Sequence, residues 1–106
     1  MKTLSNKQFE IMQIIWGEGT SLTFSMICDK TEMSGKKIRK TLDRLQRKGF
    51  LGIHYRTEFF GMSQYYYPII KADAYLRYCM ERLQELTGKK IILVEPGGMT
   101  DRKSVV

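Results

Sequence analysis

The hydrophobic period of the chain changes once, immediately after Gly49, and this change limits the folds that are open to it. Before Gly49, apolar residues recur three and four positions apart, which predicts helices at about 6–16, 24–31 and 35–48. After it, apolar and polar residues alternate, which predicts a β-hairpin over about 51–70. The chain therefore combines three short helices with one hairpin that follows them.

A last helix is expected from about 72 to 87, where the helical spacing of apolar residues returns and continues up to Gly88. The order helix, helix, helix, hairpin, helix indicates a mainly α fold with a small hairpin, which is the layout of a winged helix-turn-helix followed by a C-terminal helix. We expect the winged helix over 1–70, the last helix and an extension over 71–94, and a flexible tail over 95–106.

Local signals support these helix boundaries. Ser5 is followed three residues later by Gln8, which is the spacing of a capping box. Thr23 and Ser34 are suited to cap the next two helices, and Gly49 is suited to the left-handed conformation that ends a helix.

Basic residues are in excess over the whole chain and are concentrated in one segment. The 106 residues include 18 Lys and Arg against 11 Asp and Glu, a formal charge of +7, which favours nucleic acid as a partner and an anionic membrane second. The segment 30–50 alone holds eight basic and two acidic residues. Its helix has a narrow apolar stripe of Ile38, Leu42 and Leu45, with cations opposite and on one flank. Such a helix can bury one face and place the other in the major groove of DNA.

Eight residues are predicted to contact double-stranded DNA. The helix cations match phosphate spacing, the first-turn amides near Ser34 can bind a phosphate, and Thr41 and Arg44 can reach base edges. Arg56, near the hairpin tip, can touch a phosphate or the minor groove. The predicted set is Ser34, Lys36, Lys37, Lys40, Thr41, Arg44, Lys48 and Arg56.

Aromatic residues are concentrated in the hairpin. Phe59 and Phe60 lie at the expected turn, and we expect them to pack back on the body of the domain in preference to forming a contact surface. Tyr65, Tyr66 and Tyr67 are expected to be sheet residues and not a base-stacking platform, because strand alternation turns Tyr66 away from its neighbours.

The last helix has an apolar face that is too wide for a helix attached to an already closed core. We expect it to pack against the same helix of a second subunit in a two-fold homodimer, with Leu76 and Leu83 docking in part on their own domain. A dimer would present two recognition helices to two half-sites. The predicted dimerisation residues are Tyr75, Leu76, Cys79, Met80, Leu83 and Leu86.

The residue patterns of enzymes and metalloproteins are missing from the sequence. The chain has one histidine, His54, no glycine-rich phosphate loop and no ligand cluster at metal spacing, so no catalytic residue, cofactor or metal is expected. Cys28 and Cys79 form neither a disulfide framework nor a zinc pattern and suit a reducing cytoplasm. Apolar stretches are too short to cross a bilayer and no signal peptide opens the chain, so a cytoplasmic protein without a membrane partner is expected.

Three segments of the chain carry a family resemblance. Residues 4–16 with 22–23, residues 34–51 and residues 65–68 are similar to the opening, the recognition helix and the returning wing strand of the penicillinase-repressor and methicillin-resistance repressor family of bacterial transcription regulators. This resemblance implies a winged-helix repressor that binds a palindromic operator as a dimer. By matching positions, it implies that four residues face the groove. These are Lys37, Lys40, Thr41 and Arg44.

The chain also departs from that family. Lys37 stands where the family often has threonine, and residue 40 is also a lysine, which implies a different operator. Family members usually continue into further dimerisation helices, where some are inactivated by proteolysis, whereas a short apolar run and a polar tail follow Gly88 here. The cysteine-rich tail of copper-responsive relatives is missing, which disfavours metal sensing. Two other functions remain open, a winged helix that binds an acidic protein partner and one that binds RNA.

Overall fold

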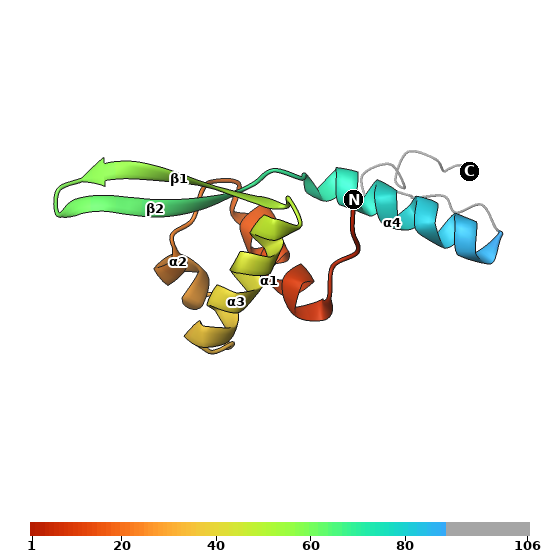
Figure 1. Ribbon diagram of the computed structural model, residues 1–106, viewed down its shortest axis with the longest axis horizontal. Coiled ribbons are helices and arrows are strands. Elements are labelled where there is room, and N and C mark those ends of the chain that lie inside the picture. The colour runs from red at the N-terminus through yellow and green to blue at the C-terminus, as the bar shows by residue number, and fades with distance from the viewer. Residues whose placement is uncertain (89–106) are drawn as a thin grey trace, which may run out of the picture. The chain divides into compact units, whose positions relative to one another are not determined.

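The computed structural model describes residues 1–88, and its elements follow the predicted order. In chain order they are α1 (Asn6–Glu18), α2 (Phe24–Cys28), α3 (Gly35–Arg47), β1 (Leu51–Glu58), β2 (Gly61–Pro68) and α4 (Ala72–Thr87) (Figure 1). Three helices followed by an antiparallel hairpin confirm the mainly α winged-helix fold. The predicted extension up to residue 94 and the predicted tail over 95–106 lie outside the described residues.

The described residues divide into two compact units. The first unit, Met1–Leu76, holds the winged helix together with the first turn of α4, and so extends beyond the boundary expected at residue 70. From Arg77 onward α4 belongs to the second unit. The helix ends at Thr87, and the N–H of the following Gly88 donates a hydrogen bond to the carbonyl oxygen of Gln84 at 2.8 Å.

Side chains cap the first three helices as the sequence predicts. The Oγ of Ser5 accepts a hydrogen bond from the N–H of Gln8 at 3.3 Å, and the Oε1 of Gln8 accepts one from the N–H of Ser5 at 3.1 Å. Thr23 and Ser34 cap α2 and α3 with one bond each, accepting from the N–H of Met26 at 3.2 Å and of Lys37 at 3.3 Å. Gly49 follows α3 with a φ of 83°, a left-handed conformation that lets the chain turn directly into β1.

Helix α2 ends at Cys28, before the predicted end at Thr31. The N–H of Lys30 donates to the carbonyl oxygen of Ile27 at 3.0 Å in a tight turn. The hydroxyl of Thr31 then accepts a hydrogen bond from the N–H of Met33 at 3.3 Å. These local bonds replace a further helical turn and start the loop that leads to α3.

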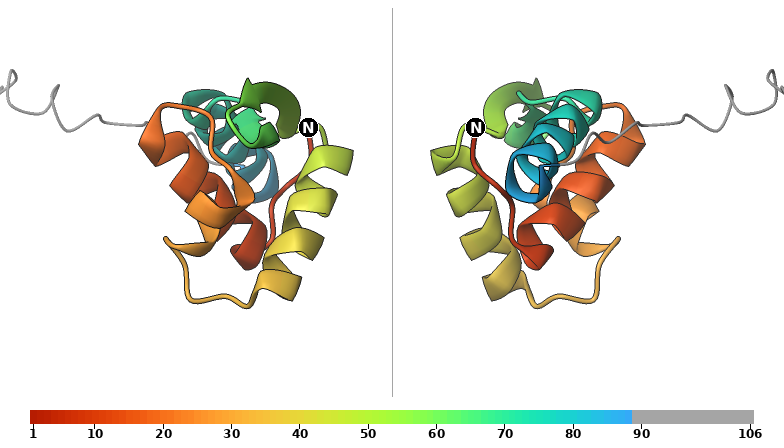
Figure 2. Two further views of the ribbon diagram at one scale, coloured as in Figure 1. Left: turned by 90° about the vertical axis from the view of Figure 1, so that its left-hand side faces the viewer. Right: turned by 90° about the vertical axis from the view of Figure 1, so that its right-hand side faces the viewer.

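The core of the first unit lies between α1, α2, α3 and the start of the hairpin. Helices α1 and α3 lie side by side below the hairpin in both views of Figure 2. Burial of a large aliphatic side chain stabilises a fold by about 1.5–3 kcal/mol, so the side chains of α3 in this core fix which face of that helix is exposed. The almost completely buried residues are Ile11, Met12, Ile15, Ile27, Ile38, Leu42, Leu45 and Phe50.

Tyr75 is a core residue, which corrects its assignment to the dimerisation surface. It is only 5% exposed, and its ring meets the ring of Phe50 edge-on with centroids 5.5 Å apart. The rings of Phe9 and Trp16 lie 6.1 and 6.0 Å from it. Its hydroxyl accepts a hydrogen bond from the N–H of Leu4 at 2.8 Å. The first turn of α4 is therefore anchored to the winged helix by this one side chain.

The hairpin has a two-residue turn. The strand register places Glu58 opposite Gly61, which leaves Phe59 and Phe60 as the turn, where the sequence analysis expected it. Strand β2 begins at Gly61, directly after the turn. Both strands are eight residues long.

Strand β2 also has a partner on its outer edge. The backbones of Leu22 and Tyr66 exchange two hydrogen bonds of 3.0 and 2.7 Å, which ties the segment before α2 to the hairpin. Near the base of the hairpin, the ring of Tyr67 lies across Gly52. A Cβ atom at Gly52 would overlap this ring, so only glycine allows the ring to lie there.

Candidate nucleic-acid interface

Helix α3 buries one side and exposes a positively charged one. Ile38, Leu42 and Leu45 are buried because their helical spacing brings them to the same face, toward α1. The Lys and Arg side chains on the remaining surface of the helix are exposed, as the sequence predicts. They are Lys36, Lys37, Arg39, Lys40, Arg44 and Arg47.

Four of these cations have no partner within residues 1–88. No hydrogen bond or ion pair in this range engages the side chains of Lys36, Lys37, Lys40 or Arg44, which we call the α3 cation set. Several of them are three or four residues apart, so their charges repel one another along the helix. A bound polyanion would remove that repulsion, which makes this surface suited to a chain of phosphates.

Other cations in and near α3 bind the protein itself. The Nη2 of Arg47 lies 3.0 Å from the Oδ2 of Asp43, one turn earlier in the helix. The guanidinium of Arg39 lies 3.9 Å above the ring centroid of Phe24, so that it links α3 to α2. These two contacts separate Arg39 and Arg47 from the α3 cation set.

Lys48, one of the predicted DNA contacts, also binds the protein itself. Its Nζ donates hydrogen bonds to the carbonyl oxygen of Thr3 at 2.9 Å and to the Oε1 of Gln8 at 2.6 Å. The end of α3 is thereby held against the residues that precede α1. A cation at this position also stabilises the negative end of the α3 dipole.

Thr41 is buried, although the sequence analysis predicted that it reaches base edges. It is 7% exposed, and its hydroxyl donates a hydrogen bond to the carbonyl oxygen of Lys37 at 2.7 Å. Thr41 lies beside the apolar stripe of the helix, and this internal bond satisfies its hydroxyl there. The residue therefore supports the packing of α3, and little of its side chain is exposed for a contact with bases.

Fewer backbone N–H groups are free to bind a phosphate at the start of α3 than the sequence analysis expected. The Oγ of Ser34 accepts a hydrogen bond from the N–H of Lys37 at 3.3 Å, so this first-turn amide is already used. The amides of Gly35 and Lys36 precede it at the exposed end of the helix and have no intrahelical acceptor. This end of α3 can still hold a phosphate through those two amides.

Arg56 lies in a row of stacked side chains on one face of the hairpin. Its guanidinium carbon is 4.5 Å from the ring centroid of Tyr65, and His54 stacks on the same ring with the two planes 8° apart. The Nε2 of His54 is hydrogen-bonded to the Oγ of Ser21 at 2.9 Å, which ties the hairpin to the segment before α2. Arg56 itself remains exposed, as a phosphate contact requires.

Glu58 braces the hairpin next to its turn. The hydroxyl of Ser63 donates a hydrogen bond to its carboxylate, and the hydroxyl of Tyr65 donates another at 2.7 Å. These bonds, that of Ser63 first, hold the pKa of Glu58 below its usual value. The same contact with Glu58 raises the pKa of Tyr65. The tip of the hairpin is thus fixed by charge-assisted hydrogen bonds.

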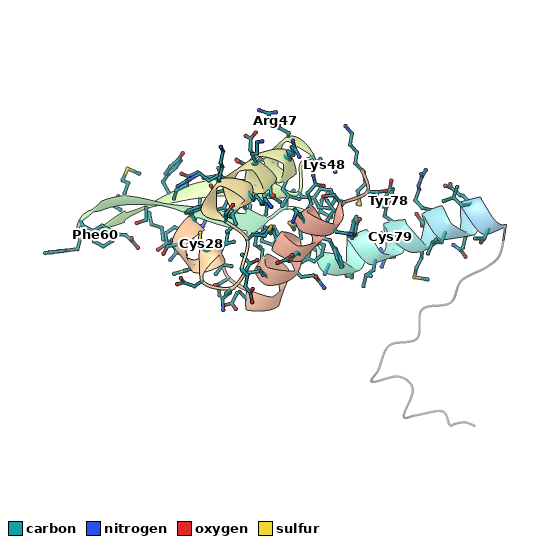
Figure 3. All side chains as sticks on the ribbon, turned by 90° about the horizontal axis from the view of Figure 1, so that it is seen from below. Cys28, Arg47, Lys48, Phe60, Tyr78 and Cys79 are labelled. Atoms are coloured by element: carbon teal, nitrogen blue, oxygen red, sulfur yellow. The ribbon has the colours of Figure 1, made fainter. Side chains whose placement is uncertain are left out.

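Phe59 and Phe60 project from the turn, so the expectation that they pack back on the domain is wrong. Phe59 is fully exposed and Phe60 is 82% exposed. Figure 3 shows Phe60 at the far end of the hairpin, pointing away from the helices. The two strands extend the turn beyond the body of the domain, which leaves these rings no surface to cover.

Comparison with known protein families supplies the identification. The model of the penicillinase repressor family matches residues 4–92, which is most of the chain. The chain belongs to the penicillinase repressor family. This membership confirms the resemblance of its three segments to that family, whose members are transcription regulators. No curated protein matches the chain individually.

In this member of the penicillinase repressor family, α4 carries exposed leucines. Leu76, Leu83 and Leu86 are 46%, 49% and 73% exposed, while Cys79 and Met80 are half-buried. The expectation that Leu76 and Leu83 dock in part on their own domain stays a prediction, since each side chain is about half exposed. The three leucines remain available to a partner.

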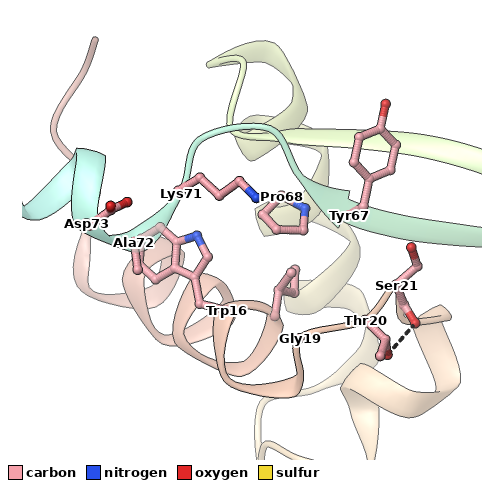
Figure 4. Close-up of a pocket in the computed structure, with 10 residues that line it drawn as sticks. Trp16, Gly19, Thr20, Ser21, Tyr67, Pro68, Lys71, Ala72 and Asp73 are labelled. Atoms are coloured by element: carbon pink, nitrogen blue, oxygen red, sulfur yellow. Dashed lines mark hydrogen bonds between the residues drawn. The ribbon is translucent and has the colours of Figure 1, made fainter.

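A pocket of about 500 Å³ opens beside the end of α1, apart from the α3 cation set (Figure 4). The indole N–H of Trp16 donates to the carbonyl oxygen of Ile70 at 2.9 Å, which fixes the ring in the wall of the pocket. Ser21, in the lining of the pocket, has its Oγ hydrogen-bonded to the Nε2 of His54 at 2.9 Å. The lining residues of the pocket are Ile15, Trp16, Gly19, Thr20, Ser21, Tyr67, Pro68, Lys71, Ala72 and Asp73.

Among residues 1–88 no group of three His, Cys, Asp or Glu side chains could hold a metal ion. None of the helices in this range is long and apolar enough to cross a membrane. Cys28 and Cys79 are both half-buried free thiols.

Proposed function

We propose that this member of the penicillinase repressor family is a cytoplasmic repressor that binds a palindromic DNA operator as a homodimer. The observation that carries the proposal is the α3 cation set, because these side chains are exposed and unpaired while the opposite face of the helix is fixed in the core. A helix of this kind fits the major groove, which is about 12 Å wide.

The residues of α3 divide into two roles. Lys36, Lys37 and Lys40 bind phosphates, where their charge releases counterions and supplies most of the affinity. Arg44 can in addition bind a guanine with two parallel hydrogen bonds, which supplies sequence preference. At the start of α3, next to Ser34, the amides of Gly35 and Lys36 bind a phosphate. Arg56 adds a phosphate contact from the hairpin.

The homodimer forms through the apolar side chains of α4. Leu76, Cys79, Met80, Leu83 and Leu86 recur at helical spacing, and the three leucines are exposed. Packing this stripe against its own copy removes the exposed apolar surface and gives the assembly a two-fold axis. Two α3 helices related by that axis match half-sites about 34–36 Å apart, or a multiple of this distance.

Selection of bound sequences from random duplex DNA tests this function as a whole. The expected result is an enriched site with two inverted half-sites at a fixed spacing of about one or more turns of DNA. Enrichment of structured RNA in a parallel selection, or a failure to enrich any duplex sequence at low salt, would contradict the proposal.

A further inference from the structure

The tip of the hairpin has residues that an ordinary turn avoids. Two-residue hairpin turns favour Asn-Gly and similar pairs, because their residues need positive φ angles, yet here the pair is Phe59 and Phe60. Tyr55 and Met62 near the turn are also exposed, at 61% and 68%. Exposed apolar side chains at and near one turn indicate a contact surface. We call these four residues the wing tip.

The wing tip is presented on a rigid support. Glu58, directly before the turn, is held by the hydroxyls of Ser63 and Tyr65. The ring of Tyr65 in turn lies against Arg56 and His54. Since these contacts already order the hairpin, little further entropy is lost when the wing tip binds a partner.

The hairpin has the reach to meet DNA that α3 has bound. Strand β1 begins at Leu51, soon after α3 ends at Arg47, so the hairpin leaves directly from the end of that helix. Eight residues at about 3.4 Å each span roughly 27 Å. Neighbouring major and minor grooves are about half a turn of DNA apart, or roughly 17 Å.

We propose that Phe59 and Phe60 form an apolar wedge that enters the minor groove beside the major groove occupied by α3. Arg56, two residues before Glu58 on the same hairpin, then lies where it can bind a phosphate at the edge of that groove. An apolar wedge partly unstacks one base step and bends the duplex toward the major groove. The inference rests on the proposed function and adds a second contact to it.

The wedge has a consequence for sequence preference. Pyrimidine–purine steps unstack most easily, so the operator should carry such a step at a fixed distance outside each half-site. This preference would arise at base pairs that α3 does not touch.

The test uses the full chain and the duplex obtained by selection, with 2-aminopurine placed at the outer step. The double variant Phe59→Ala/Phe60→Ala removes the wedge, and Phe59→Leu/Phe60→Leu keeps an apolar one. Ile69→Ala is the matched control, because Ile69 is an exposed apolar residue outside the wing tip. Circular dichroism and thermal unfolding check that all variants fold as the wild type does.

The alanine variant is expected to bind about 10- to 100-fold more weakly, and to lose the increase in 2-aminopurine fluorescence that unstacking produces. Its salt dependence should equal that of the wild type, because no charge is removed. The leucine variant and Ile69→Ala should keep both affinity and fluorescence change.

Three results would overturn the wedge, and they separate it from the proposed function. If the wild type binds DNA and the alanine variant binds equally well with the same fluorescence change, only the wedge fails. If the alanine variant keeps DNA binding but loses binding to phosphatidylglycerol vesicles, the wing tip is a membrane contact. If the wild type binds no duplex, the proposed function and the wedge fail together.

Discussion

The Nζ of Lys48 lies 2.6 Å from the Oε1 of Gln8, the same oxygen that accepts the N–H of Ser5. One side-chain oxygen therefore joins the start of α1 to the end of α3. Lys48, although it lies in the most basic segment of the chain, therefore has a structural role. It also holds α3 at a fixed angle to α1, which determines where the α3 cation set points.

Replacing Lys48 with methionine, which keeps an apolar stem but removes the ammonium group, should therefore destabilise the protein. The expected loss is about 1–2 kcal/mol, because two hydrogen bonds from a charged, half-exposed donor disappear. Urea unfolding followed by circular dichroism measures it. Lys36→Met is the matched control and should unfold like the wild type. Equal stability of the two variants would show that the contact with Gln8 contributes nothing.

Tyr75→Ala should be among the more damaging changes in α4, since it opens a cavity beside Phe50. A loss of about 3–4 kcal/mol is expected from removal of a buried aromatic ring. Leu76→Ala, at the next position and exposed, should cost less than about 1 kcal/mol. Thermal unfolding at high protein concentration compares the two. The anchoring role of Tyr75 is refuted if the order of the two variants is reversed.

Leu83→Asp should dissociate the homodimer, because it places a charge in the apolar stripe of α4. Sedimentation velocity is expected to give a dimer for the wild type and a monomer for this variant. Glu85→Ala is the control, since Glu85 is exposed and lies about 160° from Leu83 around the helix at 100° per residue. A wild type that sediments as a monomer at micromolar concentration contradicts the dimer proposed through α4.

Glu58 should make the stability of the hairpin depend on acid pH. Its pKa is lowered from 4.5 in the folded protein, so its carboxylate stabilises the fold above that value, and the contribution is lost as the pH falls through the folded pKa. Glu58→Gln should lower the urea midpoint at pH 7, and the difference from the wild type should shrink as the pH falls below 4.5. Ser63→Ala removes the hydrogen bond that lowers the pKa of Glu58 most. Its urea midpoint should therefore differ from that of the wild type with the same dependence on pH, but by less. A difference that does not change with pH would contradict this role of Glu58.

Much of the fold could be predicted because its signals are local. The capping box of Ser5 and Gln8, the cap at Ser34 and the left-handed Gly49 each depend on neighbours within a few residues. The alternation that starts at Leu51 is equally local. The exposed side of α3 also follows from helical spacing, since the buried stripe leaves only one surface for the cations.

The assignments that needed correction depend on distant contacts. Lys48 is occupied by residues more than thirty-five positions away, which a helical wheel cannot show. Tyr75 lies at the edge of the α4 stripe, and only the position of Phe50 decides that it packs inward. Phe59 and Phe60 were expected to be covered because apolar side chains usually are, and only the length of the paired strands places them beyond the domain.

The most direct test of the account is the salt dependence of DNA binding by variants of matched charge. Lys40→Ala and Arg44→Ala each remove a member of the α3 cation set, whereas Lys30→Ala removes a lysine that is paired with Glu18 at 2.9 Å. The first two should each weaken operator binding by about 1–3 kcal/mol and reduce the slope of log K against log salt by about 1 if that side chain contacts a phosphate. Lys30→Ala should leave both quantities unchanged. If all three variants bind with the affinity and slope of the wild type, α3 is not the surface that binds DNA.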